Sequence, residues 1–158
     1  FIVTDPDVVP CEECPADVFE HFERALETFP DVDKVGFSLR IDDIPEHYAH
    51  ASDVVKWESQ WWLDERYPGF FYSPIDTTFA MYRPGEGHVS YHSLRCAPPY
   101  VARHMPWYEN SALPNEELEY YLAHADSLII NWDAKVLPAN LRAQLNNMRS
   151  RYSRAQSR

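Results

Sequence analysis

The sequence is poor in long apolar runs and in cysteine. No stretch of its 158 residues approaches the roughly 20 consecutive apolar residues of a membrane-spanning helix. Cys11, Cys14 and Cys96 are an odd number of thiols, and no second pair completes a zinc site beside the C-x-x-C spacing of Cys11 and Cys14. We therefore expect reduced thiols in a cytoplasmic protein.

Positive charge is also scarce. Lysine and arginine number 14 against 25 acids, and the formal net charge of −11 argues against nonspecific nucleic-acid binding. The exception is the C-terminus, where five arginines and no acid follow Leu141. This basic tail could contact a membrane surface peripherally or a partner, although a solvated terminal helix is the simpler interpretation. We assign residues 138–158 to the tail and residues 1–137 to one domain.

The first ten residues hold the feature around which we organise the chain. The apolar run Phe1–Val3 reads as a buried strand, central in a parallel sheet, and it ends in Asp5 and Asp7. Ligands of open α/β sheets bind beyond the carboxyl ends of the strands. In an extended backbone the two carboxylates would face one hard cation, Mn²⁺ or Mg²⁺. The alternative is a turn in which aspartates cap backbone N–H groups.

A β-α-β unit is predicted next. Residues 14–29 carry an apolar stripe at helical spacing after Pro15, and residues 35–41 alternate as a half-buried strand. That strand ends in two further acids, Asp42 and Asp43. Since the two strands of such a unit run parallel, we expect both acidic strand ends at one edge of the sheet.

The remaining chain yields further candidates. We expect helices at Ser52–Leu63, at Asn115–Ala125 and through Leu141, Leu145, Met148 and Tyr152, and extended segments at Ile75–Arg83, Val89–Leu94 and Ser127–Trp132. Residues 95–108 are too rich in proline and aromatics for a regular element, and we expect an ordered loop in which His104 is a possible third metal ligand. Glu58, among tryptophans, would act as an acid or base if buried, but an arginine or solvent is its more common partner.

Four segments together resemble bacterial family-2-like glycosyltransferases of the GT-A fold: Phe1–Asp7, Lys34–Asp43, Ser73–Arg83 and Ala97–Tyr108. The resemblance implies an α/β fold with a mixed, mostly parallel sheet flanked by helices, the C-terminal part of a GT-A domain. It implies transfer of a sugar from a nucleotide-diphosphate donor to a saccharide or lipid-linked acceptor, with Mn²⁺ or Mg²⁺ bridging the diphosphate. The N-terminal half of such a domain is missing, and because a strand begins at residue 1 we expect residues upstream.

Within this reading the residues have expected roles. Asp7 ligates the metal directly, Asp5 holds it indirectly or contacts the donor ribose, and His104 approaches it from the loop. The Glu-Asp dyad of many family members is not evident, which leaves the acceptor base open between Asp76, Asp43 and Glu58. Asp76 is preferred because it precedes two threonines at the mouth of a predicted strand. A retaining enzyme would need no such base.

Two other functions compete. In a haloacid-dehalogenase-like phosphatase, Asp5 would be the nucleophile and Asp7 the acid/base, but the chain has three lysines and no Gly-Asp pair to complete that site. A non-catalytic carbohydrate-binding fragment is the other alternative. The five tryptophans and ten tyrosines suit sugar stacking and a packed core equally well.

Overall fold

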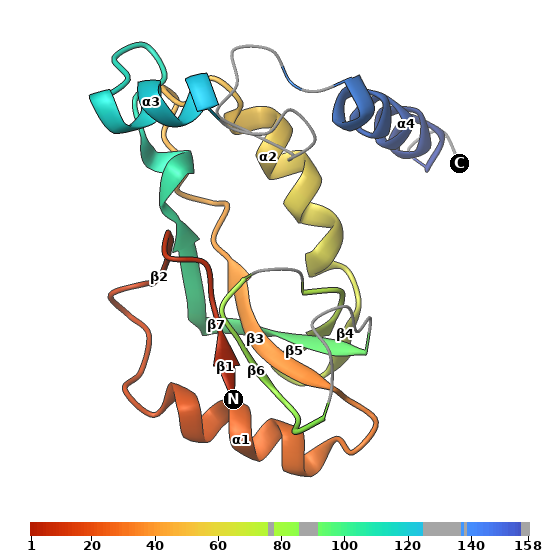
Figure 1. Cartoon of the computed structure of the whole chain (residues 1–158). Helices are drawn as coiled ribbons and strands as arrows, with labels where there is room; N and C mark the ends of the chain where they lie inside the picture. Colours follow the sequence, from red (N-terminus) through yellow and green to blue (C-terminus); the bar gives the residue numbers. More distant parts are fainter. Residues whose placement is uncertain (76–77, 86–91, 125–136, 138, 156–158) are drawn as a thin grey trace. The chain divides into compact units, whose positions relative to one another are not determined.

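The computed structural model describes residues 1–75, 78–85, 92–124, 137 and 139–155 and divides into two compact units (Figure 1). The first unit joins residues 1–43 to 58–105, and the second joins residues 44–57 to 106–158. The first contains strands β1 Ile2–Val3, β2 Val8–Pro10, β3 Lys34–Leu39, β4 Glu65–Tyr67, β5 Phe70–Tyr72, β6 Ala80–Tyr82 and β7 Ser93–His104, helix α1 Val18–Thr28 and the 3₁₀ turn η1 Ser59–Trp62. The second unit contains helices α3 Glu116–His124 and α4 Ala139–Ala155. Two elements cross the boundary: helix α2 Ala51–Glu58 has only Glu58 in the first unit, and the 3₁₀ turn η2 Met105–Tyr108 has only Met105 there.

The seven strands form one mixed, open sheet in the order β1-β6-β3-β7-β5-β4, with β2 also paired to β7. The predicted α/β class with a mixed sheet and flanking helices is confirmed. The expectation that the sheet is mostly parallel is wrong: β3 and β7 are parallel, and every other described pairing is antiparallel. One reason is local, because β4 and β5 follow each other through a tight turn at Gly69, which has a positive φ of 81° and can join only antiparallel neighbours.

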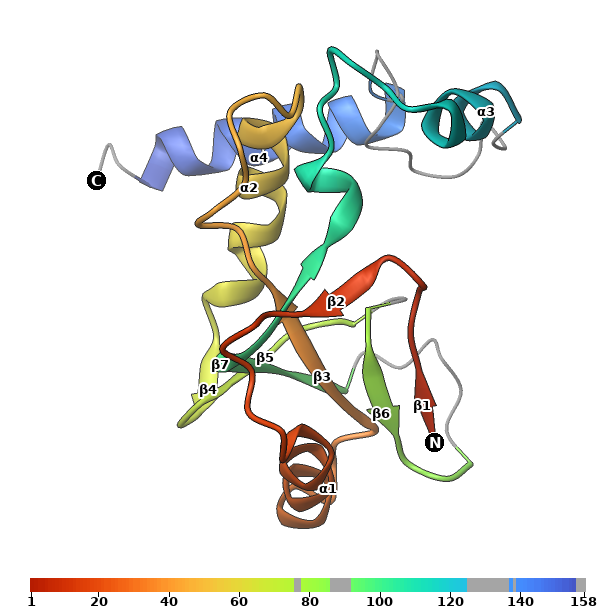
Figure 2. The same ribbon diagram turned by 90° about the vertical axis from the view of Figure 1, so that its left-hand side faces the viewer.

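Strand β1 lies at the edge of the sheet and is not its buried centre. It pairs with β6 alone among the described strands (Figure 2). Its residues Ile2 and Val3 and the preceding Phe1 remain 37, 43 and 63% exposed. β1 and β3 are both antiparallel to β6, so they run in the same direction, as the β-α-β prediction requires, but β6 lies between them. An apolar run shows that a strand is favoured, and it does not show which neighbours the strand will have.

Strand β3 is buried at all six positions, so the predicted half-buried strand is also wrong. α1 packs against β3 and β6, with the Phe22 ring edge-on to that of Phe37 at 5.2 Å. The positions of Gly36 and Ser38 in the alternation are buried as well. Lys34, the first residue of β3, is fully buried, where its ammonium donates to the Ile75 carbonyl and lies 5.1 Å from the centre of the Tyr82 ring.

Residues 93–104 form one twelve-residue strand, β7, where we predicted an irregular loop. Its first half pairs with β5 and its second half with β2, while β3 lies along the other side. Phe37 pairs with Cys96 and the next residue, Ser38, pairs with Val101, so residues 97–100 stand outside the β3 ladder. Pro98 and Pro99 fall in this bulge, where a missing N–H costs no ladder hydrogen bond.

The predicted helices are confirmed, with shifted ends. α1 begins at Val18, four residues after the expected Cys14, and α2 with η1 covers the segment predicted at Ser52–Leu63 except Leu63. Asn115 caps α3, since its Oδ1 accepts a hydrogen bond of 2.8 Å from the Leu118 N–H. Leu141 and Leu145 of α4 are buried with Leu137. No helix in the described parts of the chain is long and apolar enough to span a bilayer.

Several predictions fall wholly or partly outside the described residues. Of the expected strand at 75–83 the structure gives β6, while residues 76–77, the strand start at 89–91 and the segment 127–132 are not described. The predicted boundary between residues 137 and 138 borders the undescribed stretch 125–136 and stays a prediction.

Candidate functional site

Asp7 and His104 meet although 96 residues separate them in the sequence. The Nε2 of His104 lies 3.4 Å from the Oδ2 of Asp7. β2 and β7 enforce this meeting, because Val8 pairs with His104 and the Met105 N–H donates to the Asp7 carbonyl at 2.8 Å. The predicted approach of His104 to the D-x-D segment is therefore present, at the end of a strand and not in a loop.

The other carboxylate oxygen of Asp7, Oδ1, also suits a bound cation. Oδ1 is buried and accepts no hydrogen bond from the described residues. A buried carboxylate oxygen without a donor is costly, and a cation is one group that compensates it. Carboxylate and imidazole together are a donor set that Mn²⁺ accepts, with its remaining positions left to water or phosphate oxygens.

The backbone from Asp5 to Asp7 is not extended, so the reason for expecting both side chains to face one cation does not hold. The chain turns at Pro6 and Asp7, and the Asp5 carbonyl accepts hydrogen bonds from the Val8 N–H and the Thr4 hydroxyl. Among the described residues no group of three or more His, Cys, Asp or Glu side chains is placed to hold a metal ion. The structure thus brings together Asp7 and His104, and a direct metal contact from Asp5 stays a prediction.

The candidate bases are in different surroundings. Asp43 is held by Arg103, whose guanidinium reaches its Oδ2 at 2.5 Å, and by Arg40 at 3.3 Å. Glu58 is 5% exposed and is paired with Arg95 at 3.0 Å, which confirms the expectation that it reaches an arginine. Asp76 lies outside the described residues. Two of the three carboxylates are thus neutralised by arginine, which weakens them as bases.

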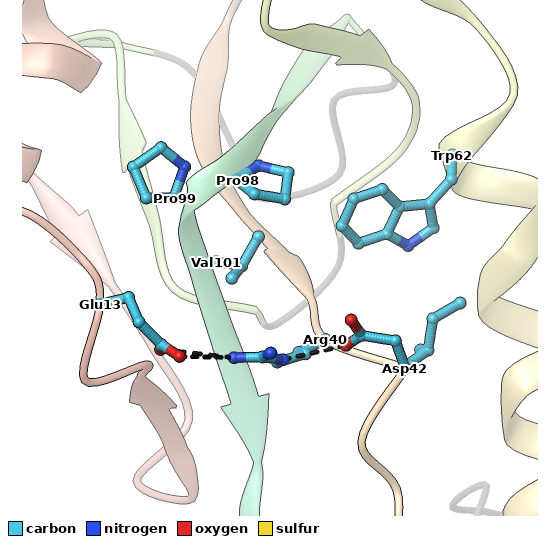
Figure 3. A pocket seen from close by; sticks show the side chains of 8 residues that line it. Glu13, Arg40, Asp42, Trp62, Pro98, Pro99 and Val101 are labelled. Atoms are coloured by element: carbon cyan, nitrogen blue, oxygen red, sulfur yellow. Dashed lines mark hydrogen bonds and ion pairs between the residues drawn. The ribbon is translucent and has the colours of Figure 1, made fainter.

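A cavity of about 470 Å³ opens at the β7 bulge (Figure 3). It is lined by Glu13, Arg40, Ile41, Asp42, Trp62, Pro98, Pro99 and Val101. The Arg40 guanidinium donates to Asp42 at 2.9 Å and to both oxygens of Glu13 at 3.2 and 3.3 Å. The two carboxylates raise the pKa of Arg40 further above its ordinary range, and the backbone N–H of Glu13 together with Arg40 lowers the pKa of Glu13.

Sequence reasoning missed this cavity. Arg40 and Asp42 stand two residues apart just after β3, and the sequence predicts Asp42 only as an acid at a strand end. Pro98 and Pro99 were the available signal, because two adjacent prolines inside a strand must sit where the ladder is interrupted. What the sequence does not contain is the alignment of that interruption with Arg40 and Trp62, since it depends on strand register.

The three cysteines are free thiols, as expected. Burial raises the pKa of Cys11 and Cys14, and it raises that of the deeply buried Cys96 most strongly. A raised pKa keeps a thiol protonated and unreactive.

Comparisons with known proteins add no relative. No protein-family model, curated protein or solved structure matches the chain. Any function therefore has to be argued from the residues and their geometry.

Proposed function

We propose that the chain is part of a metal-dependent glycosyltransferase that moves a sugar from a nucleotide-diphosphate donor to an acceptor, with a partial GT-A domain as its fold. The observation that carries the proposal is the Asp7–His104 pair, in which the buried Asp7 Oδ1 has no hydrogen-bond partner among the described residues. A site with two protein ligands suits a cation that must also bind a substrate's phosphates. The segments that resemble family-2-like glycosyltransferases support the same reading.

Each residue then has a role. Asp7 and His104 would hold Mn²⁺ or Mg²⁺, and Asp5 would act indirectly or toward the donor ribose. The bound cation would stabilise the negative charge that develops on the leaving nucleoside diphosphate. The pairing of β2 with β7 fixes the two ligands before any substrate binds, so little reorganisation is needed. Asp76 remains the proposed acceptor base, with Asp43 second because Arg40 and Arg103 neutralise it.

The phosphatase alternative is less well supported. It places Asp5 as a nucleophile at the end of a buried strand, whereas Phe1–Val3 form an exposed edge strand and Asp5 leads into a turn.

The test is nucleotide binding that depends on the metal. Calorimetric titration of UDP and GDP in the presence of Mn²⁺ should show binding to the parent chain. Asp7→Asn and His104→Gln should each weaken it by about 100-fold or more, since even groups behind the direct ligands cost 10–100-fold in metal affinity. Asp31→Asn, an exposed acid in the turn after α1, is the matched control.

Binding to Asp7→Asn as tight as to the parent would reject the proposal. So would phosphate release from p-nitrophenyl phosphate that is lost in Asp5→Asn, because that result assigns the phosphatase chemistry instead.

A further inference from the structure

Neither Asp7 nor His104 lines the cavity at the β7 bulge, so the cavity is separate from the proposed metal pair. We propose that this cavity binds the pyranose ring of a neutral saccharide, which in the proposed function is the acceptor. The role of the saccharide as acceptor rests on the proposed glycosyltransferase function, whereas saccharide binding in the cavity can be tested without it.

The walls of the cavity are apolar and rigid. Figure 3 shows the Trp62 indole on one side and Pro98 and Pro99 on the other, with Val101 below Pro98 toward Arg40. The Trp62 ring packs against Phe71 of β5 with centroids 5.3 Å apart, which holds it in place. A pyranose ring presents a flat face of C–H groups, and such a face stacks on aromatic and proline rings. The cavity volume also falls in the range of small-molecule sites.

One side of the cavity is polar in a way that suits hydroxyl groups. Glu13, Arg40 and Asp42 form a row in which the guanidinium holds both carboxylates (Figure 3). The Glu13 and Asp42 side chains remain 63 and 76% exposed, so their carboxylates keep room to accept further hydrogen bonds. Hydrogen bonds from hydroxyls to ionised carboxylates are among the strong ones. Saccharide hydroxyls supply such donors at the edge of an apolar ring.

Trp62 adds a donor. Its Nε1 is buried and makes no hydrogen bond within the described part of the chain. Figure 3 shows this nitrogen on the side of the indole that faces the charged row. A buried N–H without an acceptor is destabilising, and a ligand oxygen would satisfy it.

The charges decide against two other ligand classes. The row carries two carboxylates against one guanidinium, so it repels an anion such as the donor diphosphate. A purely apolar chain would leave the buried indole N–H of Trp62 without an acceptor. A neutral sugar ring can pack its apolar face on Trp62 and the prolines while its hydroxyls hydrogen-bond to the charged row.

The cavity and the proposed metal pair share strand β7, because Val101 lines the cavity and His104 belongs to the pair. Side chains three residues apart on a strand point to opposite faces of the sheet, so the two places do not share one surface. Asp43 connects them, since it pairs with Arg40 of the cavity and with Arg103, the neighbour of His104.

The experiment is a two-dimensional ¹⁵N–¹H NMR titration of the indole N–H resonances in EDTA, so that neither metal nor donor takes part. The probes are methyl β-D-glucopyranoside, methyl α-D-mannopyranoside and methyl α-D-galactopyranoside, each up to about 100 mM. Cyclohexylmethanol serves as an apolar ring without the hydroxyl pattern. Trp62→Phe identifies the Trp62 resonance. At least one pyranoside should shift this resonance with saturation in the millimolar range, about −4 kcal/mol at 1 mM, and cyclohexylmethanol should not.

Variants locate the binding. Trp62→Ala should weaken pyranoside binding at least tenfold, read from the resonances of the remaining tryptophans and from saturation transfer to the sugar. Trp62→Phe keeps a stacking ring and tests the indole N–H, and Asp42→Asn tests the polar row without altering the walls. Both should weaken binding severalfold and keep the claim testable if Trp62→Ala fails to fold. Leu63→Ala and Tyr120→Ala, at exposed positions, are the matched controls.

Two results would overturn the inference: no shift of the Trp62 resonance with any pyranoside, or equal shifts with cyclohexylmethanol. Its failure is distinguishable from failure of the glycosyltransferase proposal. Pyranoside binding without Mn²⁺-dependent nucleotide binding would make the chain a carbohydrate-binding fragment and leave the cavity assignment standing. Mn²⁺-dependent nucleotide binding without pyranoside binding would reject the cavity assignment and leave the glycosyltransferase proposal standing.

Discussion

At the scale of single residues, the described part of the chain buries an ion pair between Arg95 and Glu58. Arg95 and Glu58 pair at 3.0 Å with side chains only 4 and 7% exposed, and Arg95 also donates to the Pro74 carbonyl and lies 5.6 Å from the Trp61 ring. The desolvation cost of such a pair is large, and it is tolerable only while both partners are present.

Arg95→Leu should therefore lower the free energy of unfolding by about 3–5 kcal/mol, because Glu58 is left buried without its partner. The double variant Glu58→Leu/Arg95→Leu should recover much of the loss. Urea unfolding followed by fluorescence measures both. The exposed pair of Arg24 and Asp17 gives the control, since Arg24→Leu should cost about 1 kcal/mol or less. Equal losses of unfolding free energy in Arg95→Leu and Arg24→Leu would contradict the argument that burial makes the Arg95–Glu58 pair costly to break.

At the scale of elements, β3 and β6 approach each other unusually closely. A Cβ added at Gly36 of β3 would lie 2.5 Å from the Phe79 carbonyl oxygen and 2.8 Å from the Ala80 Cβ. Glycine is required here for space and not for its backbone angles, and the close approach lets β6 fit between β1 and β3.

Gly36→Ala should destabilise the protein by about 1–3 kcal/mol, because the strands must separate to admit the methyl group. Ser38→Ala on the same strand is the control: its hydroxyl is fully buried and makes no hydrogen bond among the described residues, so its removal should be nearly neutral. Thermal unfolding compares the two variants. A Gly36→Ala midpoint equal to that of Ser38→Ala would refute the steric argument.

At the scale of the whole molecule, three groups among the described residues contribute to the response to acid. Burial lowers the pKa of His21, whose ring lies between those of Tyr100 and Phe70 at centroid distances of 3.8 and 5.2 Å. Hydrogen bonds lower the pKa of Asp17, chiefly from the Tyr100 hydroxyl, and that of Glu13. In all three cases the unfolded chain binds the proton more tightly, so stability falls as the pH falls.

The histidine contribution can be isolated. It is fully present above pH about 6.5, the ordinary pKa of histidine, and is lost as the pH falls below that value toward the lowered folded pKa. His21→Phe keeps an aromatic ring in the stack and should flatten the decline of unfolding free energy between pH 7 and 5. His124→Phe at an exposed position is the control. A His21→Phe profile as steep as the parent's would show that other groups cause the decline.

The sequence by itself determined what depends on neighbours along the chain. The helices at α1, α3 and α4 follow from apolar spacing, a capping Asn115 and a stop at Pro30, because helix hydrogen bonds join residues four apart. The alternation at residues 35–41 likewise gave β3. The acids and His104 could be picked out as candidates because few other side chains suit a hard cation.

Tertiary structure alone decided which strands are neighbours and in which register. Nothing local to Phe1–Val3 marks it as an edge strand, and nothing near Pro98 shows that β7 continues through a bulge. Register brings Asp7 to His104 and sets Pro98 opposite Trp62, since a shift of one residue would turn every side chain to the other face. The candidate ligands could thus be read from the chain, whereas their meeting and the cavity beside them exist only in the folded sheet.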